Sequence, residues 1–390
     1  MKSKIAFITG ITGQDGSYLA EFLLKKGYIV HGLRRRSTIE NLENLKNINF
    51  DPQFKNKNFF LHYGDITDGS NLNKIIKEIR PNEIYNFAAQ SHVHLSFKIP
   101  EYTAEVNSLG VLRLLEAIKN NNLKTKFYQA STSEMFGDIK NKATIDQNTP
   151  FNPCSPYANS KLYSHFLVKN YREMGLFGVS GILFNHESPR RSSNFVTMKI
   201  IEAALRIKNN SQDFLYLGNL NSFRDWGNAK EYVEAMWLML NQPIARDYIL
   251  ATGKTHSVRS FAEKVFKKIG IQIIWKGRGL KEVGINKNTN KIIIKIDPYY
   301  FRPSEVSYLK GNAKKTFKQL NWKPKTNLSQ LIDIMIKSKS WFNSIGLMFH
   351  FKNLRSKNGV LLRYEVYKKT FSIINEVFKQ IDSDIKYFSK

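Results

Sequence analysis

Residues 4–19 read "KIAFITGITGQDGSYL", and this stretch decides the fold class. A short apolar run, typical of a buried strand, leads directly into Gly10, Gly13 and Gly16, which precede a helix-like segment. Glycines at this spacing let a backbone turn approach a pyrophosphate, and the amides and dipole of the following helix favour negative charge. Because the turn follows the very first strand, the sequence predicts a dinucleotide site there, with an ordinary strand-to-helix turn as the alternative.

Outward from this turn, short apolar runs alternate with amphipathic stretches over the first 130 residues. This pattern predicts a Rossmann-type, doubly wound parallel sheet covered by helices on both faces. After "GVSGILFNHESP" (178–189) the regularity ends, and loops rich in Gly and Asn follow. We therefore expect a dinucleotide-binding domain over 1–180, to which the chain returns around 225–250. A smaller α/β substrate domain is expected over 181–340, with an extra helical tail at 341–390.

Composition narrows the classes of partner and the compartment. The 390 residues carry 60 Lys and Arg against 32 Asp and Glu, a net charge of +28, which suits an anionic partner. The charge is spread without a long basic block, so nucleic-acid binding is not expected. The single cysteine, Cys154, fits a reducing compartment and a cytoplasmic protein and leaves no Cys-based metal site. No apolar run reaches ~18 residues, so no integral membrane segment is expected.

The end of the second expected strand indicates which dinucleotide binds. An NAD site usually carries an acidic residue about 20 positions after the glycines. Here "GLRRRST" (32–38) supplies Arg35 and Arg36 with the hydroxyl of Ser37, which suits a ribose 2′-phosphate and predicts NADP. A solvated basic turn is the plainer explanation in so basic a chain. "YGDI" (63–66) and "NFAAQS" (86–91) follow later strands and could frame the adenine and the nicotinamide ribose, or could be loop packing.

"SPYANSKLY" (155–163) places Tyr157 and Lys161 four residues apart on one face of a helix. There the ammonium can lower the pKa of the phenol and hold a nicotinamide ribose, giving an acid/base near neutral pH. The motif alone is a weak signal, since Tyr364 and Lys368 repeat it in the tail. The first copy gains weight from "ASTSE" (130–134), whose Thr132 stands where a short-chain dehydrogenase/reductase binds the reacting oxygen.

Further motifs extend this resemblance over residues 1–335. They are "STSE" (131–134), "SPYANSKLY", "GILFNHESPRR" (181–191), "NFVT" (194–197), "RDWGNAKEYVEAMWLML" (224–240), "ATGKTHSVR" (251–259) and "FRPSEV" (301–306). Together with the N-terminal glycines they resemble the GDP-mannose 4,6-dehydratase family, extended members of the short-chain dehydrogenase/reductase superfamily. The resemblance implies GDP-mannose as substrate and an NADP-dependent hydro-lyase reaction.

The site residues expected on these grounds fall into three groups, with no metal ligands among them. Catalytic roles are implied for Thr132, Glu134, Tyr157 and Lys161. Cofactor contacts are expected from Gly10, Thr12, Gly13, Gln14, Asp15, Gly16, Arg35, Arg36, Ser37, Asp65, Ile66, Ala88, Ala89, Gln90, Ser91, Tyr102, Lys161, His186 and Arg191. Substrate contacts are expected from Asn185, Asn194, Lys199, Arg224, Arg302 and Glu305. Taken alone, His186 would be interpreted as a structural histidine and Glu305 as the partner of a nearby cation. Arg224 and Arg302 would be interpreted as ordinary surface charges.

This assignment explains why a carboxylate, Glu134, stands at this position. A simple alcohol dehydrogenase or an epimerase needs only the hydroxyl and the tyrosine, whereas a dehydratase also needs a base. Once Tyr157 has taken the C4 hydroxyl proton and hydride has gone to NADP, the new ketone acidifies C5. Glu134 is expected to take that proton while water leaves C6, and Thr132 to bind the sugar oxygen. The hydride then returns to C6, which gives GDP-4-dehydro-6-deoxy-D-mannose, a first step towards deoxysugars such as GDP-fucose.

The sequence departs from the family pattern at three places. "RRRSTIENLENLKNINF" (34–50) replaces a serine-rich segment that joins subunits in relatives, Met198 replaces an expected arginine, and Asn228 an expected histidine. A homo-oligomer, dimer or tetramer, is still expected. Three other functions stay open: a dehydratase for another nucleotide hexose, a GDP-sugar 4-reductase or epimerase, and a non-enzymatic NADP-binding scaffold.

The tail at 341–390 lies beyond the resemblance and carries an apolar stripe. Its members recur at steps of three and four, which predicts one helix face: Tyr364, Tyr367, Phe371, Ile374, Phe378, Ile381 and Ile385. We expect this face to dock on the catalytic body, with self-association or a membrane surface as alternatives.

Overall fold

The computed structural model describes residues 3–37, 41–49, 51, 54 and 57–350. The chain divides into two compact units, Met1–Ile336 and Lys337–Lys390, and the architecture below is that of the first. The apolar stripe predicted between Tyr364 and Ile385 lies outside the described residues. Among the described residues, no helix combines the length with the apolar character that crossing a membrane requires.

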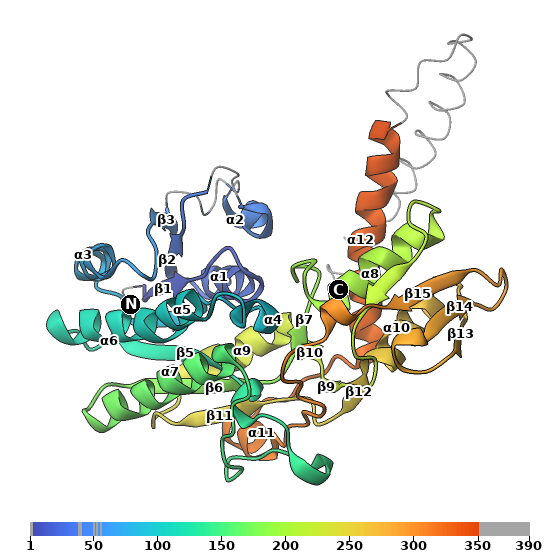
Figure 1. The fold of residues 1–390 in the computed structure, drawn as a ribbon. Coiled ribbons are helices and arrows are strands. Elements are labelled where there is room, and N and C mark those ends of the chain that lie inside the picture. The colour runs from blue at the N-terminus through green and yellow to red at the C-terminus, as the bar shows by residue number, and fades with distance from the viewer. Residues whose placement is uncertain (1–2, 38–40, 50, 52–53, 55–56, 351–390) are drawn as a thin grey trace, which may run out of the picture. The chain divides into compact units, whose positions relative to one another are not determined.

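A seven-stranded sheet forms the centre of this unit, in the order β11-β6-β5-β4-β1-β2-β3 (Figure 1). All its strand pairs are parallel. The strands are β1 (Ile5–Thr9), β2 (Ile29–Arg34), β3 (Phe59–Tyr63), β4 (Glu83–Asn86), β5 (Lys126–Thr132), β6 (Gly178–Leu183) and β11 (Asp247–Leu250). The order reverses between β1 and β4, which places a crevice at the carboxyl ends of these strands.

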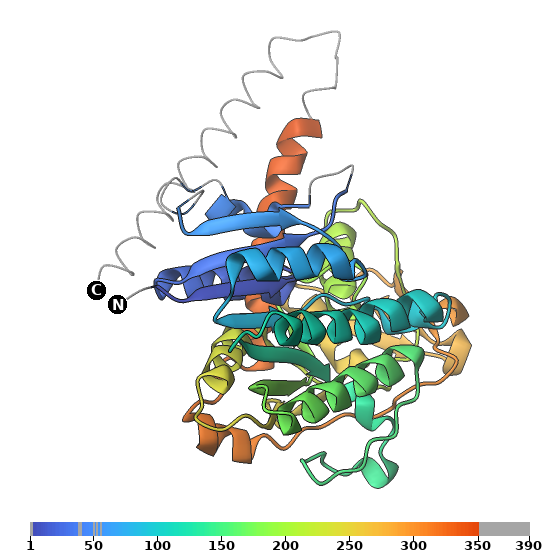
Figure 2. The same ribbon diagram turned by 90° about the vertical axis from the view of Figure 1, so that its left-hand side faces the viewer.

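Helices cover both faces of this sheet (Figure 2). One face carries α1 (Gln14–Lys25) and α9 (Ala229–Leu240), whose apolar residues join one core cluster. The other carries α3 (Gly69–Ile79), α6 (Gly110–Asn120) and α7 (Pro156–Glu173), packed on a second cluster. The Rossmann-type doubly wound sheet predicted from the sequence is confirmed, because nearly every strand is buried on both faces.

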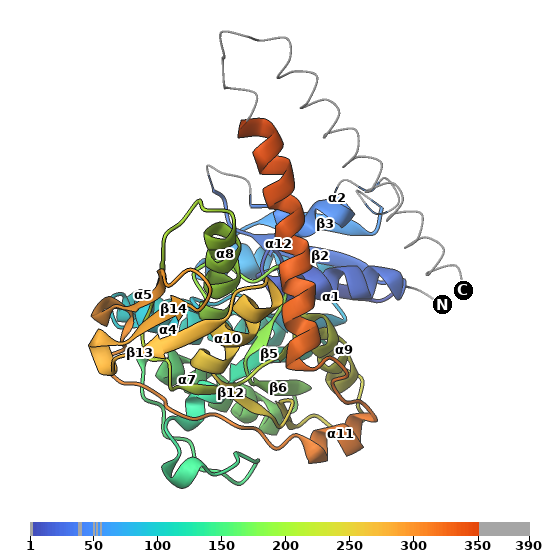
Figure 3. The same cartoon turned by 90° about the vertical axis from the view of Figure 1, so that its right-hand side faces the viewer.

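A second, four-stranded sheet has the order β13-β14-β15-β8. Its strands are β8 (Leu215–Leu217), β13 (Ile273–Lys276), β14 (Val283–Asn286) and β15 (Ile292–Ile296). Helices α8 (Val196–Lys208) and α10 (Val258–Lys268) lie on it, as Figure 3 shows. Their apolar residues form a separate core cluster with the start of α12 (Leu328–His350).

Short elements connect the two sheets. Two-stranded pairs join β7 (His186–Glu187) to β10 (Gly227–Asn228) and β9 (Phe223–Asp225) to β12 (Thr255–Ser257). The remaining α-helices are α2 (Lys46–Asn49), α4 (Val93–Ser96), α5 (Pro100–Ala104) and α11 (Lys314–Leu320). Short turns of other helix types occur at Glu43–Leu45, Glu105–Leu109, Ser133–Phe136, Lys140–Lys142, Gly279–Lys281 and Pro298–Tyr300.

Local sequence explains why the key elements begin where they do. Ser155 caps α7 by accepting a hydrogen bond from the amide of Ala158, and Pro156 occupies the first helical position. In the glycine turn, Gly10 has φ of +65°, and a Cβ on Gly16 would lie 2.5 Å from the carbonyl oxygen of Gly10. The turn therefore requires glycine at both positions.

Candidate active site

The glycine turn leaves the first amides of α1 open to an anion. Its N-cap residue is Gly13, which has no side chain to cap the helix, and the amide of Gly13 bonds the carbonyl of Gly10 at 3.0 Å. Asn44 supports the turn by donating to the carbonyl of Thr12. Uncapped amides at the start of a 12-residue helix suit the pyrophosphate of a dinucleotide. The local structure thus fits the dinucleotide site predicted from the sequence.

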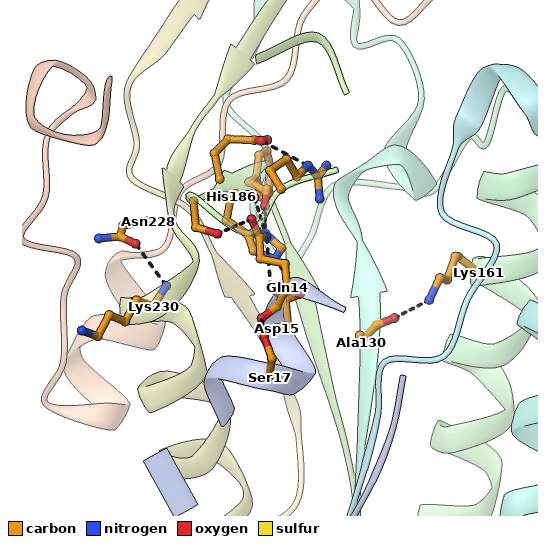
Figure 4. Close-up of polar contacts among 12 residues, drawn as sticks. Gln14, Asp15, Ser17, Ala130, Lys161, His186, Asn228 and Lys230 are labelled. Atoms are coloured by element: carbon orange, nitrogen blue, oxygen red, sulfur yellow. Dashed lines mark hydrogen bonds and ion pairs between the residues drawn. The ribbon is translucent and has the colours of Figure 1, made fainter. Parts of the chain in front are cut away.

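A buried ion pair joins this turn to a residue 171 positions further along the chain (Figure 4). His186 Nε2 lies 2.8 Å from Asp15 Oδ2, and His186 Nδ1 lies 2.8 Å from the carbonyl of Phe184. Burial by itself raises the pKa of Asp15, but the charge and hydrogen bond of His186 outweigh it and leave the pKa below its ordinary value. Burial likewise lowers the pKa of His186, and Asp15 reverses this shift. The Nε2 atom of His186 is therefore occupied by its ion pair with Asp15 in this structure.

The four residues expected to be catalytic lie together around the end of β5. Thr132 is its last residue, and Glu134 follows in the 3₁₀ turn Ser133–Phe136, where its amide donates to Thr132 Oγ1 at 3.2 Å. Tyr157 and Lys161 come from the first two turns of α7. All four side chains line one cavity of about 690 Å³.

Tyr157 and Lys161 do not have the electrostatics predicted from their spacing. Burial raises the pKa of Tyr157 to about 12, and the hydrogen bond with Thr132 only partly opposes this. Lys161 donates to the carbonyl of Ala130 at 2.9 Å, as Figure 4 shows, and burial lowers its pKa to about 8. The lowered pKa predicted for Tyr157 is thus wrong for this structure, because desolvation dominates over any effect of the lysine.

Two arginines approach Glu134 from the second half of the chain. Arg302 NH1 lies 3.7 Å from Glu134 Oε1, and Arg224 NH2 lies 3.6 Å from Glu305 Oε1. Burial lowers the pKa of Arg224, while the charges of Glu134 and Glu305 raise it. Glu305 thus pairs with a cation, as its plainer interpretation held, and it also lines the cavity. Two guanidinium groups in the wall of one cavity suit a diphosphate.

The buried carboxylate of Asp225 fixes the strand that carries Arg224. It accepts hydrogen bonds from the amide and hydroxyl of Thr252 at 2.8 and 2.6 Å and from the amide of Gly253 at 2.8 Å. Burial raises the pKa of Asp225 to about 6 despite these bonds. The "RDWG" motif therefore combines a cavity-lining arginine with a carboxylate that ties β9 to the loop after β11.

Fifteen of the predicted site residues line the cavity. They are Asp15, Ala89, Ser91, Thr132, Glu134, Tyr157, Lys161, Asn185, His186, Arg191, Asn194, Lys199, Arg224, Arg302 and Glu305. The others do not line it: Gly10, Thr12, Gly13, Gln14, Gly16, Arg35, Arg36, Ser37, Asp65, Ile66, Ala88, Gln90 and Tyr102. Within this second group, Arg35 NH1 donates to the hydroxyl of Tyr102 at 2.9 Å, which ties the basic turn to α5.

Sequence reasoning missed several residues of the cavity wall. Tyr300 lies under Lys199, whose Nζ is 3.2 Å from the ring centroid, and burial lowers the pKa of Lys199 to about 8. The Cζ atom of Arg191 lies 3.5 Å from the ring centroid of Phe195, and its Nε lies 3.1 Å from Glu187 Oε2. The aromatic run "PYYF" (298–301) directly before Arg302 was the available signal for Tyr300. Phe195 stands in the "NFVT" motif quoted above, but that motif does not indicate that its ring packs on Arg191.

Asn107 was also missed, and it supports the loop after β4. Its side chain donates to the carbonyl of Gln90 at 3.1 Å and accepts from the amide of Gln90 at 2.9 Å. It also donates to Ser160 on α7. Asn107 stands in the π-helical turn Glu105–Leu109, a distortion that often accompanies functional positions. Among the described residues, no cluster of three or more His, Cys, Asp or Glu could hold a metal ion.

The fold and this site together define the class of protein. A doubly wound sheet with a glycine turn after β1, and a tyrosine and lysine on the helix beside a strand-end threonine, make a short-chain dehydrogenase/reductase. Residues 7–335 match the profile of the family described as GDP-mannose 4,6 dehydratase. The chain belongs to that family.

Known proteins show the same relationship over most of the chain. It is 51% identical over 341 residues to a GDP-mannose 4,6 dehydratase of Drosophila melanogaster, covering 86% of each chain. It is 51% identical over 336 residues to that of Homo sapiens, covering 85% of this chain and 90% of the relative. Among solved structures, a UDP-glucose 4-epimerase from Thermus thermophilus in complex with NAD has a TM-score of 0.70 at 24% identity, covering 86% and 98%. At that identity the structural likeness shows the fold alone.

Proposed function

We propose that this chain is an NADP-dependent nucleotide-sugar 4,6-dehydratase that converts GDP-D-mannose to GDP-4-dehydro-6-deoxy-D-mannose. The observation that carries the proposal is the position of Glu134, a carboxylate in the same cavity wall as Thr132 and Tyr157. The relatives named GDP-mannose 4,6-dehydratase, which are 50–51% identical to this chain in sequence, support the proposal. A reductase or an epimerase would not need this carboxylate, so the family match and the site agree.

The chain's own residues fit a bound dinucleotide. Gly10 and Gly16 form a turn that a Cβ would block, and the first amides of α1 face it uncapped. A bound nicotinamide supplies a hydride acceptor for C4 and a hydride donor for C6. We assign the 2′-phosphate of NADP to Arg35 and Arg36, since Tyr102 already holds Arg35 in place.

In the proposed reaction Tyr157 removes the C4 hydroxyl proton. Burial holds the pKa of this phenol at about 12 with Lys161 already on the same helix, so Lys161 alone does not make it a base. We assign the remaining stabilisation of the phenolate to the positive charge that a bound oxidised nicotinamide would supply. Thr132 then binds the C4 oxygen as charge develops. Glu134 takes the C5 proton and passes it to the hydroxyl that leaves C6, which departs as water. When hydride is added at C6, the proton that Tyr157 removed is returned to C5, which completes the 6-deoxy product.

The second half of the chain is proposed to hold the GDP-sugar. Arg224 and Arg302 would bind the diphosphate, and Lys199 on Tyr300 stands further along the same wall. Asn185 Oδ1 is buried without a hydrogen-bond partner among the described residues, so it is free to meet a sugar or ribose hydroxyl. On this basis residues 1–180 would bind cofactor and 181–340 mainly substrate.

Assembly and location are further parts of this proposal. Helix α7 exposes Tyr163 and Phe166, with 46% and 42% of their surfaces accessible, which supports a contact between copies of the chain and hence a homo-oligomer. A cytoplasmic location is proposed from the single cysteine.

The proposal is tested by incubating the purified chain with GDP-mannose and NADP and following the sugar nucleotide by mass spectrometry. We expect a loss of one water, with no net consumption of NADP. Tyr157→Phe serves as the control, since it keeps the packing of the ring and removes the acid/base. An unchanged mass with the folded, cofactor-loaded chain would refute the proposal.

A further inference from the structure

A buried histidine outside the proposed chemistry lies directly behind the end of β5. His165 is on α7, one turn after Lys161, and only 4% of it is exposed. Its Nδ1 is 3.2 Å from Ser131 Oγ, and its Nε2 is 3.8 Å from Asp247 Oδ2. Ser131 directly precedes Thr132, so the residue that His165 contacts lies one position before the end of β5.

The neighbours of His165 determine its hydrogen-bonding state. Asp247 on β11 faces Nε2 and is itself paired with Arg172, while Lys169 lies further along α7. Burial lowers the pKa of His165, and Asp247 only partly opposes this, so the ring is neutral near pH 7. A carboxylate beside Nε2 favours the tautomer with its proton there. Nδ1 then accepts a hydrogen bond from the hydroxyl of Ser131.

A second contact of His165 leads to Glu134. The ring of Phe151 meets His165 edge-on with centroids 5.3 Å apart, and the same ring packs at a tilt against Phe136 with centroids 4.9 Å apart. Phe136 ends the 3₁₀ turn that contains Glu134. The amide of Asn152 also bonds the carbonyl of Met135 in that turn. His165 therefore contacts the strand before the proposed base directly, and the turn that contains this base only through Phe151.

We infer that His165 is a positioning residue, which acts through Ser131 to hold the end of β5 where Thr132 and Glu134 meet the sugar. This inference rests on the proposed function. His165 itself does not line the cavity, although Ser131 does. Loss of the His165 side chain should therefore affect turnover and leave substrate binding almost unchanged. A histidine that only filled space would instead affect stability.

Two substitutions of similar chemistry separate these roles. The side-chain oxygen of asparagine can occupy the place of Nδ1 and accept from Ser131, whereas glutamine presents its amide near the place of Nε2. We expect His165→Gln to lower kcat roughly tenfold, and His165→Asn to lower it by less than about threefold, as loss and rescue of one buried hydrogen bond. KM for GDP-mannose should change by less than about twofold in both. Glutamine fills more of the vacated volume, so a packing role predicts the opposite order.

Ser131→Ala provides the second arm of the experiment. If His165 acts through Ser131, the double variant with His165→Gln should be no slower than the slower single variant, because both remove the same interaction. Thermal unfolding and NADP binding of each variant are measured alongside. Additive losses, or equal kcat values for the Asn and Gln variants, would overturn the inference. An inactive wild-type chain would instead count against the proposed function, which the wild-type assay reports separately.

Discussion

Replacing Glu134 by glutamine isolates the step that separates a dehydratase from its relatives. The amide keeps the shape of the side chain, and the bond from the backbone amide of residue 134 to Thr132 Oγ1 does not involve the carboxylate. What is lost is the base and the charge 3.7 Å from Arg302. A positioned general base contributes about 10²–10⁴-fold, or about 2.7–5.4 kcal/mol of barrier. We expect dehydration to slow by that factor while C4 oxidation continues.

Rapid-reaction absorbance measures this directly. With GDP-mannose added to the NADP-loaded Glu134→Gln variant, reduced nicotinamide should accumulate and persist, because the following elimination is blocked. Exchange of the C5 hydrogen with deuterated solvent should disappear as well. Glu282→Gln is the matched control, since Glu282 pairs with Arg259 at 2.6 Å and does not line the cavity. Normal turnover by Glu134→Gln would refute the proposed role of this carboxylate.

Three further predictions follow from other parts of the chain. Replacing Arg35 and Arg36 by alanine should weaken NADP binding more than NAD binding, measured by titration; an unmutated chain that prefers NAD would contradict the assignment. His31, 2.8 Å from His62, has its pKa lowered to about 4 by burial and by that neighbour, so its contribution to stability is lost as pH falls from about 6.5 towards 4. His31→Phe should therefore lose less stability than wild type between pH 7 and 5 in urea unfolding, and an equal loss would contradict this. Deleting 346–390 should leave dehydration detectable while changing stability or oligomer size, measured by light scattering; a folded, NADP-binding truncation without activity would show that the tail serves the active site.

The sheet could be predicted from the sequence because its signals are local. Each strand and helix of the first 130 residues has its own apolar period, and the glycine turn needs only a few consecutive residues. Thr132, Glu134, Tyr157 and Lys161 share a cavity wall for the same reason, since they come from one strand end and the helix that follows it. Their chemical roles stay predictions.

Electrostatic partners were harder to predict because they join distant segments. Asp15 and His186 are 171 residues apart in sequence, and no local sequence pattern predicts that they pair. The pKa of Tyr157 was misjudged for a related reason: spacing indicates a neighbouring cation, but the extent of burial comes only from tertiary packing. Burial turned out to be the larger effect.

The departures at Met198 and Asn228 illustrate the same limit. Met198 is fully buried in the core cluster beneath α8, where a guanidinium would be costly to desolvate, so the methionine is explained by packing in this chain. Asn228 caps α9 by accepting a hydrogen bond from the amide of Lys230 (Figure 4). Its side chain also donates to Thr326 Oγ1 at 3.2 Å. Met198 packs in the core and Asn228 caps a helix, and comparing the residue types with the family pattern could not indicate either role.

Lys199 allows the substrate side of the cavity to be tested through pH. Burial lowers its pKa to about 8, so its charge is lost as pH rises through that value, and Lys161 behaves in the same way. We expect kcat/KM for GDP-mannose to fall above about pH 8 with two groups titrating, because this ratio reports the free enzyme. In Lys199→Arg the guanidinium stays charged and one of the two lysine titrations is removed, so the decline of log kcat/KM with pH should become shallower by one unit of slope. A slope that Lys199→Arg leaves unchanged would exclude Lys199 from the binding of the anionic substrate.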